Sequence, residues 1–263
     1  MEIIDFIYFI ILGLIQGITE FLPVSSSGHI QLIEFFGFTQ SSGLFTTIIL
    51  HFASALSILF VFYKKIKEII FFQSKDSLIY IVKIILALIP AVLIGLSFED
   101  QIKRIFEGEA YLLAIMFFIT ALVLYGTNKI NTRNSNLTYI IVFLIGLSQA
   151  FAIMPGISRS GLTICTALFL GVNKNEATNF SFIIALPLIF GAVIKSLLFD
   201  FPEVKAEVLT INLYPLLVSF LVTFFVGLLC CKWMIKIVEK NKLSYFSYYC
   251  FGLSVLLILS YVK

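Results

Sequence analysis

Charged residues are scarce in this chain. They make up 13% of its 263 residues, whereas hydrophobic residues make up 60%. A soluble fold of this length cannot bury so much apolar surface, so the composition excludes a water-soluble globular protein and predicts a protein of the bilayer. Apolar runs recur from end to end and leave no room for a soluble domain. We therefore expect residues 1–263 to form a single membrane domain, with membrane lipid and not nucleic acid as its partner.

Two further signals are absent. The apolar run 3–22 is preceded by Glu2 and contains Asp5, without basic residues ahead of it and without a small-residue cleavage site, so we do not expect a signal peptide. The cysteines show neither CxxC nor metal-ligand spacing, and their apolar surroundings predict small buried hydrophobic side chains. They are Cys165, Cys230, Cys231 and Cys250.

Six apolar runs are long enough, or nearly so, to cross a bilayer, which takes about 20 residues. They are 44–63, 78–98, 111–127, 177–199, 213–231 and 245–262. Two other pairs of apolar segments, 3–22 with 27–38 and 138–154 with 160–171, each flank a polar loop, and the second arm of each pair is too short to cross. We predict that each pair is a re-entrant hairpin. The predicted fold class is an all-α integral membrane protein with six transmembrane helices and two such hairpins.

The two polar loops are related in sequence. Residues 13–28, GLIQGITEFLPVSSSG, align without a gap to residues 146–161, GLSQAFAIMPGISRSG, and share six identities. This similarity indicates two repeats, about 1–130 and 131–263. Three crossings in each repeat would invert the second relative to the first, so the two hairpins should enter from opposite faces and meet near the midplane.

The distribution of lysine and arginine predicts an orientation. If each hairpin returns to the side it entered from, twelve basic residues share one side and five the other, so the first side should be cytoplasmic and both termini should face outward. The twelve are Lys64, Lys65, Lys67, Lys75, Lys83, Lys129, Arg133, Lys174, Lys232, Lys236, Lys240 and Lys242. The five are Lys103, Arg104, Lys195, Lys205 and Lys263.

Glu20 is an acid inside apolar sequence. A carboxylate at the bilayer centre costs roughly 2.5–3.5 kcal/mol on insertion scales, which makes it a functional-site hypothesis. Gln16 lies four residues earlier and therefore on the same helical face. The two oxygens could help to hold a hard cation such as Mg²⁺ or Ca²⁺. The alternatives are an interhelical hydrogen bond for Gln16 and an ion pair with Arg159 for Glu20.

Serines followed by a glycine precede the second arm of each hairpin, at 25–28 and at 158–161. One serine is enough to cap a helix, which is the structural interpretation. Several hydroxyls and free amides at a positive helix end would also suit phosphate oxygens. Arg159 is the only arginine in an apolar segment, and its planar guanidinium matches a phosphate group.

The two histidines receive different interpretations. His29 follows Ser26 by three residues and could transfer a proton as a general base or as a leaving-group acid, although a hydrogen-bonded core position is the alternative. His51 lies outside the two polar loops, and we expect a structural or supporting role. Gly13 and Gly17 form a GxxxG step that predicts close helix packing.

The motifs GLIQGITEFLPVSSSGH at 13–29 and PGISRSGLT at 155–163, with ALIPA near Pro90 and ALP near Pro187, resemble the bacterial undecaprenyl-diphosphate phosphatases of the bacitracin-resistance type. The resemblance covers essentially the whole chain. It implies a cell-membrane enzyme that uses a divalent cation to hydrolyse undecaprenyl diphosphate to the monophosphate and inorganic phosphate. That reaction recycles the lipid carrier for peptidoglycan synthesis and confers bacitracin resistance. Where the family has Glu or Gln followed by Glu, this chain has the less acidic pair.

The resemblance also implies roles for individual residues. Catalytic roles fall on Glu20, Ser26, His29 and Arg159, and metal binding falls on Gln16 and Glu20. The substrate-binding residues that we expect are Ser25, Ser27, Gly28, Ser158, Ser160, Gly161 and Thr163. Ser26 as the nucleophile and an activated water remain alternatives. The active site should open to the outer, periplasmic face while the polyprenyl tail stays in lipid.

A secondary transporter or flippase of a polyprenyl phosphate or an anion is the alternative function, because inverted repeats with paired hairpins are also a transporter architecture. The sequence leaves the oligomeric state open, a homodimer included.

Overall fold

The computed structural model describes residues 3–37, 43–106, 110–129 and 135–261, which form twelve α-helices and one 3₁₀ turn. The helices are α1 (Ile3–Thr19), α2 (Ser26–Phe35), α3 (Leu44–Val61), α4 (Tyr63–Ile70), α5 (Ser77–Phe106), α6 (Ala110–Gly126), α7 (Tyr139–Phe151), α8 (Arg159–Phe169), α9 (Lys174–Phe199), α10 (Phe201–Thr210), α11 (Leu213–Glu239) and α12 (Tyr245–Tyr261), and the 3₁₀ turn η1 is Thr127–Lys129. The all-α prediction is confirmed for these residues.

Four helices, α3, α5, α9 and α11, are long and apolar enough to cross a membrane. They coincide with four of the six predicted crossings. The other two crossings correspond to α6 and α12, which have 17 residues each. This length is at the lower limit for a span, so the six-crossing arrangement stays a prediction.

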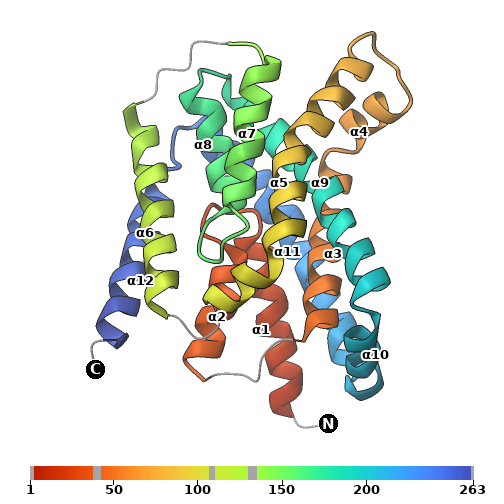
Figure 1. Cartoon of the computed structure of the whole chain (residues 1–263), viewed down its shortest axis with the longest axis vertical. Coiled ribbons are helices and arrows are strands. Elements are labelled where there is room, and N and C mark those ends of the chain that lie inside the picture. Colours follow the sequence, from red (N-terminus) through yellow and green to blue (C-terminus); the bar gives the residue numbers. More distant parts are fainter. Residues whose placement is uncertain (1–2, 38–42, 107–109, 130–134, 262–263) are drawn as a thin grey trace.

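The segments predicted as hairpins form two helix pairs, α1 with α2 and α7 with α8. Figure 1 shows that the two pairs start at opposite ends of the molecule and that their connecting loops lie close together near its middle. Pro23 lies in the first loop and Pro155 in the second. Proline cannot donate the next helical hydrogen bond, which explains why both first arms end before the loop.

The first helix of each hairpin packs against a long helix of the other half: α1 packs against α11, and α7 packs against α5. Small residues permit the close approach: a Cβ added to Gly13 would lie 2.6 Å from the backbone oxygen of Ser219, and one added to Gly146 would lie 2.5 Å from that of Ala87. Gly17 also packs against α11. The packing role predicted for the GxxxG step is therefore confirmed.

Two helices were not predicted. The basic segment after residue 63 begins with α4, and α10 follows α9 in the same way that α4 follows α3. The carboxylate of Glu207 in α10 accepts hydrogen bonds from the amides of Phe45 (2.6 Å) and Thr46 (3.1 Å). A distant element thus caps the first turn of α3, the helix that carries His51.

The two ends of the molecule carry different elements. Helix α4, η1 and the start of α9 lie at one end, and α10 lies at the other, with both chain termini (Figure 1). The first group contains basic residues that we assigned to the cytoplasmic side, whereas α10 contains Lys205. Arg133 and Lys263, which also entered that assignment, lie outside the described residues.

Candidate active site

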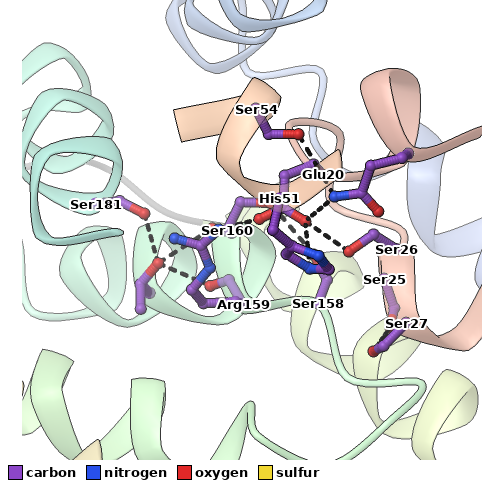
Figure 2. A network of polar contacts seen from close by, with 12 residues as sticks. Glu20, Ser25, Ser26, Ser27, His51, Ser54, Ser158, Arg159, Ser160 and Ser181 are labelled. Atoms are coloured by element: carbon purple, nitrogen blue, oxygen red, sulfur yellow. Dashed lines mark hydrogen bonds and ion pairs between the residues drawn. The ribbon is translucent and has the colours of Figure 1, made fainter. Parts of the chain in front are cut away.

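The carboxylate of Glu20 is the centre of the polar network between the two hairpins (Figure 2). One of its oxygens accepts a hydrogen bond from the guanidinium of Arg159, with which it forms an ion pair. The other accepts from the Ser26 hydroxyl (2.7 Å) and from the amide nitrogen of Gln16 (3.1 Å). The Nε2 atom of His51 lies 3.7 Å from the same oxygen. The ion pair considered for Glu20 from the sequence is present, and it joins residues 139 positions apart.

Helical periodicity explains why Gln16 reaches Glu20, which lies one turn further along. The Gln16 side chain is fully buried, and its amide nitrogen also lies 3.4 Å from the Ser54 hydroxyl of α3. Its carbonyl oxygen is buried without a hydrogen-bond partner among the described residues. The interhelical contact considered for Gln16 is therefore present, and Gln16 is not part of either cavity wall.

Serine hydroxyls cap both short arms. The Ser25 hydroxyl accepts from the amides of Gly28 (3.2 Å) and Gly156 (3.1 Å), and the Ser158 hydroxyl accepts from the amide of Gly161 (3.1 Å). Ser25 has a φ of +69°, a backbone conformation that is costly for a residue with a side chain. Its second bond crosses to the other hairpin, so Ser25 ties the two loops together as well as capping α2.

The hairpin tips touch at positions without bulky side chains. A Cβ on Gly28 would lie 2.9 Å from the Cα of Gly156, and a Cβ on Gly161 would lie 3.0 Å from the Cβ of Pro23. The two contacts are related by the same offset of 133 residues that aligns the sequence motifs. The tips therefore pack in a reciprocal manner, which brings Glu20 and the start of α8 together.

Arg159 combines charge with partial access. It is the first residue of α8, and its side chain is 18% exposed, whereas that of Glu20 is 5% exposed. The free amides at the start of a helix add positive potential on the same side. The site thus contains a positively charged guanidinium and hydroxyl groups next to a buried carboxylate.

These residues line a cavity of about 330 Å³. Its polar wall consists of Thr19, Glu20, Ser25, Ser26, Ser27, Thr47, His51, Gln149, Ser158, Arg159 and Ser196, and the rest is mostly apolar residues of α3 and α9 and of the segment from α7 to Ile157. The cavity is large enough for a small anionic group. The cavity is partly open, so His51 and Arg159 keep some exposure while Glu20 is buried.

Four residues that we expected to bind substrate do not line this cavity. They are Gly28, Ser160, Gly161 and Thr163. The two glycines form the tip contacts, the Ser160 hydroxyl lies 3.4 Å from the backbone oxygen of Leu22, and the Thr163 hydroxyl donates to the backbone oxygen of Arg159 (2.8 Å). These residues hold the loops in place.

His29 is likewise absent from the cavity wall. Its Nδ1 lies 2.7 Å from the backbone oxygen of Ser25 and its Nε2 lies 2.7 Å from the Tyr249 hydroxyl, on which the ring stacks. A carbonyl can only accept, so we assign the proton to Nδ1, and Nε2 can accept from Tyr249. His51 is instead the imidazole beside Glu20. Sequence reasoning gave it only a supporting role, because its polar neighbours come from other elements.

A second and larger space, of about 1120 Å³, adjoins the cavity. It is a predominantly apolar groove formed by α2, α5, α6 and α9, and it shares Ile153, Leu188, Ala192 and Ser196 with the polar cavity. Pro187 of α9 lines the groove, and α5 contributes residues on both sides of Pro90. An apolar chain in the groove could therefore carry a polar head into the cavity.

The residues present permit a cation but do not form a complete metal site. Among the described residues, no three His, Cys, Asp or Glu side chains converge as metal ligands. Glu20 is an oxygen donor of the kind that Mg²⁺ and Ca²⁺ prefer and lines the cavity, whereas Gln16 is fully buried, does not line the cavity and turns its amide nitrogen toward Glu20. Further ligands would have to come from substrate and water.

The apolar helices and the internal polar cavity define a multi-pass helical membrane protein with a polar cavity that contains an acid, an arginine and several hydroxyl groups. Comparison with known families then shows that the chain belongs to the bacitracin resistance protein BacA family, which matches residues 9–256. It is similar to the undecaprenyl-diphosphatase of Christiangramia forsetii (43% identity over 95% of both chains) and to that of Bacteroides thetaiotaomicron (40% identity over 94% of this chain and 96% of the relative). A relative from Methanococcus vannielii with the same description is 38% identical over 95% of this chain and 98% of its own.

Proposed function

We infer that this protein is a membrane phosphatase that hydrolyses undecaprenyl diphosphate to undecaprenyl phosphate and inorganic phosphate. Family membership and the similarity to two undecaprenyl-diphosphatases support this inference. The structural observation that carries it is the convergence of Arg159 and Ser26 on Glu20 in a polar cavity that adjoins an apolar groove. The reaction recycles the lipid carrier for peptidoglycan synthesis and accounts for bacitracin resistance.

We propose that Ser26 attacks the terminal phosphorus. Its hydroxyl already donates to Glu20, which takes the proton as the Ser26 oxygen bonds to phosphorus. The bond from that phosphorus to the bridging oxygen breaks, and the lipid monophosphate leaves. Water then hydrolyses the phosphoserine and releases inorganic phosphate. Arg159 stabilises the charge on the transferring group, which is usually the largest contribution to catalysis of this kind.

A divalent cation is proposed to share the site. Glu20 and the carbonyl oxygen of Gln16 would hold it, as predicted from the sequence. When bound, it would neutralise charge on the diphosphate oxygens. The protein residues would still position the substrate through Arg159 and the serine hydroxyls.

The groove is proposed to hold the first part of the prenyl chain. Its wall is mostly apolar, and the polar side chains on its rim include Gln31, Glu34 and Lys195. Because the groove shares residues with the cavity, the tail can remain in an apolar environment while the diphosphate reaches Ser26.

We further propose the full membrane arrangement predicted from the sequence: six crossings, two re-entrant hairpins and an inverted repeat, with the site opening outward. Three observations support it. The hairpin tips have reciprocal contacts, α1 and α7 pack on corresponding helices, and the cavity includes Leu44 in the first turn of α3, at the end where the termini lie.

The test is phosphate release from undecaprenyl diphosphate by the purified protein in detergent, where no gradient exists to drive transport. Wild-type protein should release phosphate, and a chelator should reduce the rate until Mg²⁺ or Ca²⁺ is restored. Ser26→Ala should lower kcat by a factor of about 10³ or more if the serine is the nucleophile. Near-normal turnover by Ser26→Ala would replace the covalent route with an activated water. A folded wild-type sample that releases no phosphate with cation present would favour the transporter alternative.

A further inference from the structure

Gln149 is a buried polar residue that the proposed reaction does not use. It lies near the end of α7, is 1% exposed and lines the polar cavity. Neither its amide nitrogen nor its carbonyl oxygen has a hydrogen-bond partner among the described residues. Buried polar groups are rarely left unpaired, since an unmade hydrogen bond costs free energy. This amide therefore requires an explanation.

Comparison of the two repeats explains why the Gln149 amide has no hydrogen-bond partner among the described residues. It is the counterpart of Gln16, 133 residues later. Gln16 donates to Glu20, the residue one turn further along its segment. The residue at the corresponding position after Gln149 is Ile153, which cannot accept a hydrogen bond. The second repeat thus has the amide without an acid one turn later, which leaves an uncharged donor and acceptor in the cavity wall.

We propose that Gln149 binds the diphosphate group of the substrate. This inference rests on the proposed function, which places a diphosphate in the same cavity. The amide nitrogen donates to a non-bridging phosphate oxygen, and the carbonyl oxygen accepts from a bound water or a protonated phosphate oxygen. Ile153 belongs to both the cavity and the groove, so Gln149 lies one helical turn before the point where the two spaces join. Gln149 is then a substrate-binding residue supplied by the second hairpin, in addition to Arg159.

The charge of the site explains why an amide is suited to this position. Glu20 is paired with Arg159, so a second carboxylate in the same wall would repel the diphosphate. A second cation at this buried position would carry the cost of burying its charge while no substrate is bound. An amide offers a donor without either cost. The substrate completes its hydrogen bonds, so the unpaired state is limited to the empty enzyme.

The test uses Gln149→Met, which removes both polar groups and keeps a side chain of similar length. In detergent, KM for undecaprenyl diphosphate should rise about tenfold while kcat changes by less than about twofold, because the lost contact binds the ground state and the transition state alike. Without ligand, the Tm should stay the same or rise, since an unpaired polar group has been removed. The increase in Tm produced by inorganic diphosphate should become smaller than in wild type.

The matched control is Ser219→Ala. The Ser219 hydroxyl is also buried without a partner among the described residues, but it lies on α11 outside the cavity. This variant should keep the wild-type KM and the wild-type response to inorganic diphosphate. The inference fails if Gln149→Met keeps the wild-type KM and the wild-type response to diphosphate. A fall in its Tm together with these unchanged values would identify Gln149 as a purely structural residue. If wild type released no phosphate but inorganic diphosphate stabilised it more than Gln149→Met, the proposed function would fail while the binding role stood.

Discussion

The carboxylate of Glu20 and the guanidinium of Arg159 form an ion pair of two largely buried charges, and burying each charge costs free energy. Each would be unstable alone in an apolar interior, and together they neutralise one another. Arg159 retains enough exposure to meet a ligand, while Glu20 is nearly enclosed. A diphosphate that enters the cavity would compete for the same guanidinium and release Glu20 for proton transfer. Under the proposed mechanism, the pair would stabilise the empty site and give up Arg159 to the substrate.

Single and double substitutions can separate these two roles. Arg159→Met should lower kcat by about 10³-fold and destabilise the protein by about 3 kcal/mol, because it leaves Glu20 as an unpaired buried charge. Adding Glu20→Gln should restore most of the stability but none of the activity. The measurements are phosphate release and thermal unfolding for both single variants and the double variant. Equal stability of Arg159→Met and the double variant would contradict the importance of this pair for folding.

At the scale of elements, the packing of the two hairpin tips positions Glu20 next to Arg159. Gly28 faces Gly156 and Gly161 faces Pro23, so the chain carries its smallest or most compact residues where the two tips cross. The crossing is fixed by the hydrogen bond from the Gly156 amide to Ser25. Helices α1 and α7 are in turn held against α11 and α5. Small displacements of either tip would separate Glu20 from Arg159.

Gly28→Ala tests this crossing. The added Cβ would lie 2.7 Å from a ring atom of Phe117 and 2.9 Å from the Cα of Gly156, and such overpacking typically costs about 1–3 kcal/mol. The Tm should fall and phosphate release should drop well below the wild-type rate. Gly252→Ala in α12 is the control, because its added Cβ meets nothing within 4 Å and alanine favours the helix. If both variants kept full activity, the tip contact would not matter for catalysis.

At the scale of the whole molecule, the two ends differ in charge and in whether the polar cavity extends toward them. The end with the chain termini and α10 also carries the start of α3, where the cavity and Glu207 lie. The opposite end carries the basic helix α4. With the basic end in the cytoplasm, substrate would reach the site from the outer leaflet.

Labelling with a membrane-impermeant maleimide tests this orientation in intact cells. Lys205→Cys on α10 should react from outside, whereas Lys67→Cys on α4 should react only after the membrane is permeabilised. Both side chains are exposed, and the four native cysteines are buried, so the background should be low. The reverse pattern would place the active-site mouth in the cytoplasm.

Much of the architecture could be predicted because the length of an apolar run is a local property. The runs around α3, α5, α9 and α11 and the two pairs of apolar arms that flank a polar loop were found in this way. Helices α4 and α10 were missed because a charged or mixed segment of eight to ten residues has no length signal of its own.

By itself, the sequence determined that this is a helical protein for a bilayer, that it carries two related polar loops, and that an acid, an arginine and serines belong to them, because burial cost and periodicity act along the chain. Only the tertiary structure decided which of these side chains meet. His51, not His29, lies beside Glu20, and Gln149 lines the cavity without a hydrogen-bond partner in the part of the chain that the structure describes, while Thr163 supports a loop. Those contacts depend on how helices from separate parts of the chain pack against one another, and no local sequence pattern specifies that packing.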